Sequence, residues 1–171
     1  MKTVAITGHT GQIGKALVDA FNQKGYTVVG ISRSTGFDLT IKEDRIRAAD
    51  EIAKYDIFVN LAWPPTQPEI LEMVWNRWQG NRSKLIINVG TMSTSRPSSM
   101  LDDINYYKIK KQLDTKHWQL IDQGHYPKMT LVRAAMGVDE TTFDGWARFL
   151  VSLVGQEYHV LDIAYIRIPL E

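Results

Sequence analysis

The chain has 171 residues, a formal net charge of +1 and no cysteine. This length fits one domain with a buried core, and the balance of charge excludes an electrostatic field that collects nucleic acid or an anionic membrane. The lack of cysteine excludes disulfide scaffolds, thiolate metal sites and cysteine nucleophiles. Because no apolar run is long enough to span a bilayer and the first residues do not form a signal peptide, we expect a cytoplasmic protein.

Short apolar runs alternate with segments of helical period along most of the chain. The apolar runs predict strands at 3–7, 26–32, 37–39, 56–62, 84–89 and 129–133, followed by an extended tail at 159–168. Apolar residues at helical spacing predict helices at 12–24, 43–54, 70–78, 105–122 and 143–154. Strands that are apolar on both faces and alternate with helices indicate an α/β domain with a doubly wound parallel sheet. Such sheets bind ligands at the carboxyl ends of their strands.

Three glycines at a spacing of three, Gly8, Gly11 and Gly14, follow the first predicted strand and open the first predicted helix. Gly8 permits a tight turn, Gly11 lets the backbone approach a phosphate, and Gly14 lets the helix lie close to the sheet. The N–H groups near Gln12 and Ile13 then face a diphosphate, and the helix dipole adds to the attraction. The alternative is a loop that only needs positive φ angles.

The second predicted strand ends in Ser32, Arg33 and Ser34, with no acidic residue among them. A guanidinium between two hydroxyls suits a phosphate group, which it can bind through paired charge-assisted hydrogen bonds. The alternative is a solvated surface arginine.

The segment 105–111 contains the spacing Tyr-x-x-x-Lys twice, as Tyr106 with Lys110 and as Tyr107 with Lys111. Residues four apart share one face of a helix. A phenol has a pKa near ~10, and a neighbouring ammonium favours the phenolate, which brings the group toward useful acid and base chemistry. The alternative is a lysine-rich helix with aromatic residues in the core.

With these motifs in this order, the sequence resembles the short-chain dehydrogenase/reductase family from Thr3 to about Val138. The glycine spacing is similar to that of its extended and atypical members. The resemblance implies a Rossmann fold over 1–171 as a single compact domain, with a minimal substrate-covering segment at about 139–171. It also implies NADP(H) as the cofactor, because NAD-specific members place an acidic residue where this chain has Arg33.

The catalytic residues that the resemblance implies are Tyr106, Lys110 and Thr91. Tyr106 is the acid/base, Lys110 is its electrostatic partner and holds the nicotinamide ribose, and Thr91 is the substrate anchor. The pair Tyr107 and Lys111, and Ser93 in place of Thr91, are the alternatives.

The choice between the two registers depends on the residues that follow the lysine. The family often places an apolar and then an acidic residue at the third and fourth positions after it. Leu113 and Asp114 fit that pattern after Lys110 and therefore favour the first register.

The cofactor-binding residues that the resemblance implies come from the loops after the predicted strands and from the tyrosine helix. They are Gly8, Thr10, Gly11, Gln12, Ile13, Gly14, Ser32, Arg33, Ser34, Asp38, Leu39, Asn60, Ala62 and Lys110. The run Asp38-Leu39-Thr40 resembles an element whose aspartate contacts adenine, and the alternative is an N-cap for the following helix. Trp63 stands where the family has a glycine beside the cofactor.

The function implied is NADP(H)-dependent transfer of hydride between the nicotinamide and a small carbonyl or alcohol, without a metal. One alternative is a non-catalytic NADP-binding sensor or partner protein. Another is an isomerase or dehydratase of nucleotide sugars, which the short remainder after Val138 disfavours. The histidines His9, His117, His125 and His159 lack metal-ligand spacing. We expect no nucleic-acid or membrane partner and a homodimer through the tyrosine helix.

Overall fold

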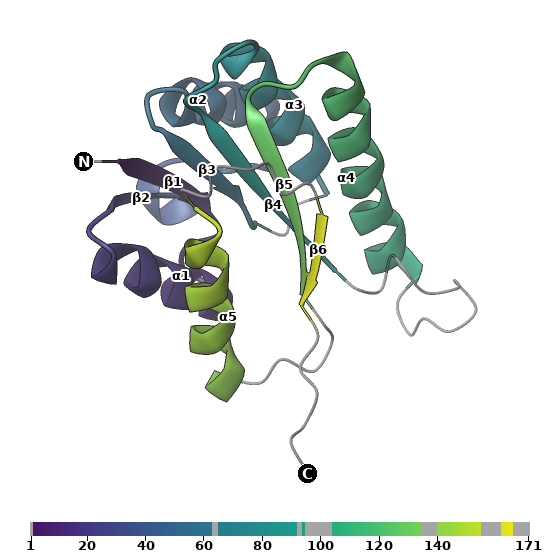
Figure 1. Cartoon of the computed structure of the whole chain (residues 1–171). Coiled ribbons are helices and arrows are strands. Elements are labelled where there is room, and N and C mark those ends of the chain that lie inside the picture. The colour runs from purple at the N-terminus through teal and green to yellow at the C-terminus, as the bar shows by residue number, and fades with distance from the viewer. Residues whose placement is uncertain are drawn as a thin grey trace.

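In the part of the chain that the structure describes, six parallel strands form one sheet in the order β2-β1-β3-β4-β5-β6 (Figure 1). The computed structural model describes residues 2–62, 65–91, 94, 104–134, 140–154 and 162–165. The strands are β1 (Thr3–Thr7), β2 (Thr27–Ile31), β3 (Ile57–Asn60), β4 (Leu85–Thr91), β5 (Lys128–Ala134) and β6 (Asp162–Tyr165). Since every neighbouring pair is parallel, all the strands end at the same edge of the sheet.

Helices cover both faces of the sheet (Figure 1). They are α1 (Gln12–Gln23), α2 (Lys42–Ile52), α3 (Gln67–Trp78), α4 (Ile104–Gln123) and α5 (Glu140–Ser152), with a short 3-10 turn η1 (Arg33–Thr35). α1 and α5 pack together on one face, and α2, α3 and α4 lie in a row on the other. The chain leaves β1 first toward β2 and then returns past it to β3, so the winding direction reverses between β1 and β3. The predicted doubly wound sheet is confirmed, and this reversal is where such folds bind ligands.

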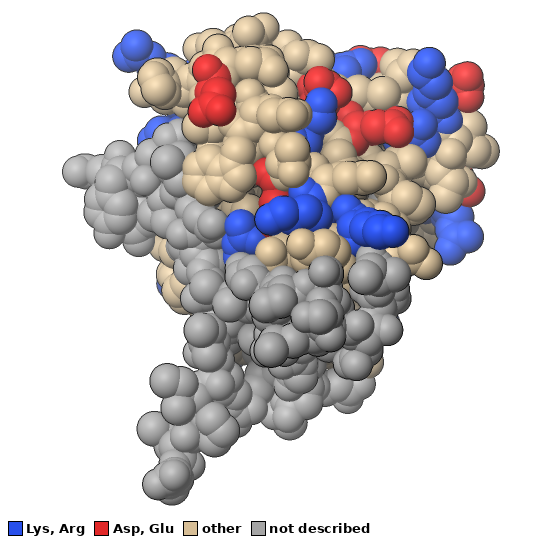
Figure 2. All heavy atoms as spheres, turned by 90° about the vertical axis from the view of Figure 1, so that its right-hand side faces the viewer, with Lys and Arg blue, Asp and Glu red and all other residues tan. Residues whose placement is uncertain are grey.

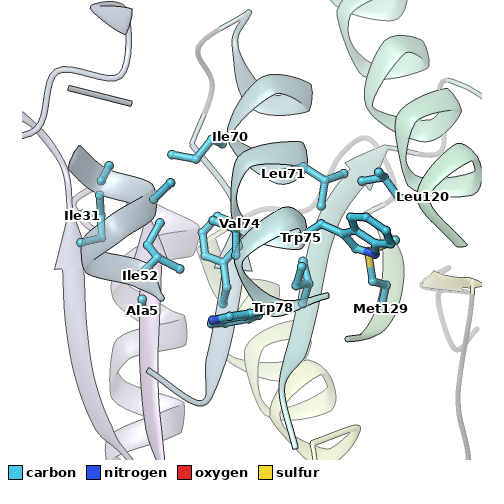
Figure 3. Close-up of a cluster of buried hydrophobic side chains, with 14 of the residues drawn as sticks. Ala5, Ile31, Ile52, Ile70, Leu71, Val74, Trp75, Trp78, Leu120 and Met129 are labelled. Carbon is cyan, nitrogen blue, oxygen red and sulfur yellow. The ribbon is translucent and has the colours of Figure 1, made fainter. Parts of the chain in front are cut away.

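The core between the sheet and the row of three helices is built around α3 (Figure 3). Leu71, Val74, Trp75 and Trp78 of α3 recur at helical spacing, and each is at most 2% exposed. They pack on one side against α2 and on the other against Leu120 of α4. Large aromatic side chains contribute most of the apolar area in such a cluster, so α3 anchors its two neighbours to the sheet.

The strand predicted at 37–39 is not formed. After η1 the backbone N–H of Phe37 donates to the carbonyl oxygen of Ser32, and the N–H of Asp38 donates to the carboxylate of Asp44. The next residues form a turn closed by bonds from Thr40 to Asp38. Because these local bonds engage the backbone, the segment does not add to the sheet, and β2 is its edge strand.

Most of the predicted elements form with ends that differ by one to three residues, and two differences bear on the site and the sheet. α3 begins at Gln67, ahead of the apolar stripe that starts at Ile70, because Pro68 is tolerated in a first helical turn. Within the predicted extended tail, residues 162–165 pair with β5 as the parallel strand β6.

None of the described helices is both long and apolar enough to cross a membrane. Among the same residues, no three His, Asp or Glu side chains gather in a way that could hold a metal ion.

Candidate functional site

The loop between β1 and α1 is built on close backbone contacts that only glycine allows. Gly8 has a φ angle of 74°, and a Cβ there would lie 2.9 Å from Cα of Ala62. A Cβ on Gly14 would lie 2.2 Å from the carbonyl oxygen of Gly8 and 2.7 Å from Cα of His9. Rotating a side chain cannot relieve contacts this short with the backbone. The fold itself therefore requires Gly8 and Gly14.

The side chain of His9 packs against the neighbouring strand. A Cβ on Gly30 of β2 would lie only 2.3 Å from three atoms of the His9 ring. The imidazole therefore covers β2 at the position where a side chain of residue 30 would otherwise lie. This packing holds the loop against the sheet. His9 has a packing role here.

Gly11 is different, because the protein leaves room around it. Its backbone is extended, with φ −73° and ψ 169°. The nearest atom that a Cβ would meet is the carbonyl oxygen of Gly8 at 3.5 Å, which is an ordinary contact. Protein packing therefore does not require a glycine at this position. A glycine at this position is explained if a ligand approaches the backbone of the loop closely.

The N-terminus of α1 is open to an anion. Gly11 is the N-cap, no described side chain caps the helix, and the first turn from Gln12 holds no acidic residue. The backbone N–H groups of a first helical turn lack partners within the helix and carry the positive end of its dipole. Gln12 and Ile13 stand at this end, as predicted, so a phosphate would find hydrogen-bond donors and no opposing carboxylate there.

The side chain of Thr7 joins the two strands between which the winding reverses. Its hydroxyl donates to the carbonyl oxygen of Val59, 3.3 Å away, and accepts from the backbone N–H groups of Leu61 and Ala62 at 3.1 and 3.2 Å. This bridge fixes the chain that leaves β3 beside the glycine loop. The two loops therefore form one rim.

A cavity of about 350 Å³ opens on that rim. The residues that line it are Gly8, Thr10, Ile31, Ser32, Arg33, Phe37, Asp38, Leu39, Thr40 and Ala62. Seven of the predicted cofactor-binding residues are among them: Gly8, Thr10, Ser32, Arg33, Asp38, Leu39 and Ala62. The others, Gly11, Gln12, Ile13, Gly14, Ser34, Asn60 and Lys110, are not in the lining. The structure thus joins the glycine loop, the end of β2 and the turn before α2 into one site.

The end of β2 holds its polar side chains in a tight turn. The N–H of Ser32 donates to the hydroxyl of Thr35, 2.9 Å away, and the hydroxyls of Ser32 and Ser34 are 2.8 Å apart. Arg33 begins η1 and is exposed beside the cavity. The turn is ordered by its own hydrogen bonds and presents the guanidinium at its surface.

Asp38 closes the turn that precedes α2. Its Oδ1 accepts from the hydroxyl and the N–H of Thr40 at 2.7 and 3.0 Å. These two bonds hold the pKa of the Asp38 carboxyl below its usual value, and the charge of Arg33 acts in the same direction. The N-cap of α2 is Ile41, so the alternative interpretation of Asp38 as the helix cap is wrong. Asp38 instead stands in the wall of the cavity.

The two Tyr-x-x-x-Lys registers lie on different faces of α4. Lys110 is 5% exposed and points toward the sheet, whereas Lys111 is exposed. Tyr106 is four residues before Lys110 and therefore shares its inward face. Tyr107 lines an outer groove of about 550 Å³ together with Lys108 and Lys111. Figure 2 shows the face that carries α4, with Lys and Arg side chains gathered across its middle. This geometry favours the pair Tyr106 and Lys110.

The ammonium of Lys110 is held by neutral oxygens. Its Nζ donates to Oε1 of Gln67 and to the carbonyl oxygen of Val89, both 3.0 Å away. Burial lowers the pKa of Lys110 to about 8, and the negative charge of Asp114 acts in the opposite direction. A lysine whose pKa approaches neutrality is poised for proton chemistry.

Thr91 is the last residue of β4 and is buried. Its carbonyl oxygen accepts from the hydroxyl of Thr94, 2.9 Å away. Ile87 and Val89 pack on the side of α1 and α5, so strand alternation directs Thr91 to that side as well. The side chain of Thr91 is therefore directed to the face of the sheet opposite the one that α4 and Tyr106 cover. The alternative residue Ser93 lies outside the described residues, as does Trp63.

Sequence reasoning missed a buried polar network beneath this site. Asn60, predicted as a cofactor residue, is fully buried and donates from Nδ2 to the carbonyl oxygen of Gln67 at 3.2 Å and to Oδ1 of Asn88 at 3.0 Å. Nδ2 of Asn88 in turn lies 3.0 Å from Nδ1 of His117, which is also fully buried. The only available signal was polar residues inside apolar runs, and that signal does not identify their partners.

The fold and the site together define a dinucleotide-binding α/β domain, and comparison with solved structures agrees. An oxidoreductase (short chain dehydrogenase/reductase) from Brucella ovis superposes with a TM-score of 0.75 at 18% identity, over 97% of this chain and 100% of that one. A metagenomic short-chain oxidoreductase in complex with NADP gives 0.76 at 15%, over 99% and 98%. An alcohol dehydrogenase from Thermococcus sibiricus complexed with 5-hydroxy-NADP gives 0.77 at 13%, over 96% of each chain. At these identities the likeness is one of fold.

A family model confirms the resemblance from the sequence side. The model of the NAD dependent epimerase/dehydratase family matches residues 4–110, which is more than half of the chain. The protein therefore belongs to the NAD dependent epimerase/dehydratase family, which lies within the extended short-chain dehydrogenase/reductases. No curated protein matches the sequence.

Proposed function

We propose that this protein is an NADP(H)-dependent oxidoreductase that transfers hydride between a nicotinamide and a small carbonyl or alcohol. The observation that carries the proposal is the cavity at the reversal between β1 and β3. It combines a glycine loop at the uncapped N-terminus of α1 with the exposed cation of Arg33. The helix N-terminus suits a diphosphate, and the guanidinium suits the 2′-phosphate that distinguishes NADP from NAD.

The relatives in fold support a nicotinamide cofactor. Two of them were solved in complex with NADP or 5-hydroxy-NADP, and a 3-alpha-hydroxysteroid dehydrogenase from Pseudomonas was solved in complex with NADH. Gly11 also fits a nicotinamide dinucleotide. The protein leaves free the space that a Cβ on Gly11 would take, and that space lies where the diphosphate would approach the helix.

The bound dinucleotide would supply the hydride. With substrate bound, Tyr106 would give its phenolic proton to the carbonyl oxygen, and in the reverse direction it would take the proton from the alcohol. The ammonium of Lys110 would stand beside the phenol as its electrostatic partner and would hold the nicotinamide ribose. Thr91 stands at the end of β4, where its hydroxyl would have to reach the substrate oxygen at the edge of the sheet in order to orient it.

A second candidate is supported by the family match, since that family is named for epimerases and dehydratases. Such reactions oxidise and then reduce the same substrate, so they return the dinucleotide to its starting state. A substrate that is converted with no net change in the absorbance of the reduced nicotinamide would identify this class.

The experiment that tests the proposal is the substitution Gly11→Ala. Because φ is −73° and the nearest contact is 3.5 Å, alanine fits the fold, and we expect the free energy of unfolding to stay within about 1 kcal/mol of wild type. The added methyl group stands where the diphosphate would lie, so we expect NADPH affinity to fall at least tenfold. Fluorescence titration and chemical denaturation measure the two quantities.

Gly14→Ala is the matched control, because its Cβ would lie 2.2 Å from the carbonyl oxygen of Gly8 and must disturb the fold. We expect it to lose stability as well as binding. If Gly11→Ala binds NADPH as wild type does, or if wild type binds neither NADPH nor NADH, the proposed function is wrong.

A further inference from the structure

A single buried glutamine links the tyrosine helix to the strand beside the glycine loop. Gln67 is the first residue of α3 and is 1% exposed. Its Nε2 donates to the carbonyl oxygen of Asn60, 2.7 Å away, and its Oε1 accepts from Nζ of Lys110 at 3.0 Å. The two ends of one amide therefore contact the end of β3 and the buried lysine of α4.

The orientation of this amide is determined by its neighbours. Its NH₂ group needs an acceptor and finds one in the carbonyl of Asn60, while its oxygen needs a donor and finds one in Lys110. The opposite orientation would place NH₂ against an ammonium and oxygen against a carbonyl. Asn60 also returns a bond from its Nδ2 to the main-chain oxygen of Gln67, so the two residues are joined twice.

The contacts continue until they return to α4. Asn60 bonds to Asn88 of β4, and Asn88 bonds to His117, two turns after Lys110 on the same helix. The ring of contacts Lys110–Gln67–Asn60–Asn88–His117 thus passes through α3, β3 and β4 before it closes on α4. A closed ring resists the sliding of α4 along the sheet, so it fixes where the lysine ammonium lies.

The charges around the lysine show why an amide matters in this place. The titratable groups on the same face of α4 are Tyr106, Asp114 and His117, and Asp114 is paired with Arg133 of β5. Two of the contacts that α3 and β4 make with the ammonium come from neutral oxygens, those of Gln67 and of the Val89 backbone. The contact at Gln67 therefore holds the ammonium without cancelling its charge.

We propose that Gln67 is a positioning residue, which holds the Lys110 ammonium at the tyrosine through a neutral hydrogen bond anchored on the end of β3. The inference rests on the proposed function, because it gives Lys110 its role beside Tyr106. Gln67 has no contact with the reacting atoms in this assignment and acts only through the lysine.

The test is the pKa of Lys110, followed by NMR of isotopically labelled lysine side chains in the full chain without cofactor. Gln67→Met keeps the volume but removes the acceptor of the ammonium. We expect the pKa of Lys110 to fall by about one unit or more, because the ammonium loses a hydrogen bond that stabilises its charged form. Gln67→Glu places a carboxylate there and should raise the pKa. Gln79→Met, an exposed change at the end of the same helix, should leave it unaltered.

Opposite shifts distinguish positioning from a merely structural role. A glutamine that only filled space would, when replaced, let water reach Lys110, and the pKa would then rise toward 10.5 in both variants. A rise or no change in Gln67→Met overturns the proposal. If that variant does not fold, Gln67→Glu decides. A raised pKa with Lys110 still protected from reductive methylation supports the proposal, and an unchanged pKa or a methylated lysine overturns it.

A second readout uses NADPH alone. The affinity of wild type for NADPH should fall as the pH rises through the pKa of Lys110, and in Gln67→Met this fall should begin at a pH about one unit lower. An unshifted profile also counts against the proposal. If wild type does not bind NADPH at all, the proposed function fails, while the NMR result still decides whether Gln67 holds the lysine.

Discussion

Arg33 is the residue on which the choice between the two nicotinamide dinucleotides depends. It lies beside the cavity at the end of β2, with the ordered hydroxyls of Ser32 and Ser34 on either side. Asp38 also lines the cavity, and its carboxylate accepts two hydrogen bonds from Thr40. The guanidinium is therefore the cation of the cavity lining to which an incoming phosphate would bind.

We predict that Arg33→Ala weakens NADPH binding about tenfold or more, because a hydrogen-bonded charge pair with the 2′-phosphate is worth about 1.5–3 kcal/mol. NADH lacks that phosphate, so its affinity should change much less. Isothermal titration with both dinucleotides measures the difference, and Arg82→Ala, an exposed arginine that stacks on Tyr126, is the matched control. Equal losses for NADPH and NADH would remove the assigned role of Arg33.

The tandem tyrosines give a second prediction at this scale. Tyr106 shares the inward face of α4 with Lys110, and Tyr107 lies in the outer groove. We expect Tyr106→Phe to lower turnover of carbonyl substrates by a factor of about 100 or more, since it removes the proton donor and leaves the cofactor cavity intact. Tyr107→Phe should remain active. Initial rates on a carbonyl panel, with NADPH affinity measured in parallel, decide the register, and the reverse result would assign Tyr107 and Lys111.

At the scale of elements, the sequence was sufficient where one local pattern determines one structure. The apolar runs of β1, β3, β4 and β5 and the helical stripe of α1 required no tertiary information. The segment 37–39 has a strand-like composition, but its side chains satisfy the backbone locally and so keep it out of the sheet. Local pattern also cannot show that Gln67, a polar residue among prolines, becomes buried, because only the packing of α3 against β3 and α4 places it there.

The same distinction explains what could be predicted of the site. Glycine spacing and the end of β2 are local signals, and four of the residues they selected, Gly8, Thr10, Ser32 and Arg33, line one cavity. The ring through Asn60, Asn88 and His117 joins residues far apart in the sequence. Its members have no common spacing, so a single sequence cannot reveal it.

A prediction for α3 follows from its place in the core. Trp75 is 1% exposed and packs between the sheet and α4, whereas Trp118 of α4 is 37% exposed. We expect Trp75→Ala to lower the free energy of unfolding by about 3–5 kcal/mol, and Trp118→Ala to lower it by less than about 1 kcal/mol. Urea denaturation monitored by circular dichroism compares the two. Similar losses would show that α3 is not the anchor of this core.

At the scale of the whole molecule, the sheet is shared by two cores. One core lies under α2, α3 and α4 and contains Trp75 and Trp78, and the other lies under α1 and α5 and contains Trp146. The strands β1 to β5 contribute alternate side chains to the two cores, as Ile86 and Ile87 do in β4. Neither core can therefore be lost while the other keeps its strands.

We predict one cooperative unfolding transition, because the shared sheet couples the two cores. Variants that retain Trp78 or Trp146 as the only tryptophan, with the others changed to Phe, report on the two cores by fluorescence. Each variant should unfold at the same urea concentration by fluorescence and by far-ultraviolet circular dichroism. Two separate midpoints within one variant would show that the chain contains two folding units and would contradict the prediction of a single domain.

The stacking of the His9 ring on Gly30 restricts how this protein can evolve. If position 30 gained a side chain while His9 was kept, the new side chain would clash with the His9 ring. The loop after β1 would then no longer fit against β2, the edge strand. If His9 is first replaced by a smaller residue, a side chain at position 30 can be accommodated. If Gly30 is replaced first, the new side chain clashes with His9. The two sites should therefore change in a fixed historical sequence, and descendants with a small residue at position 9 are where variation at position 30 can begin.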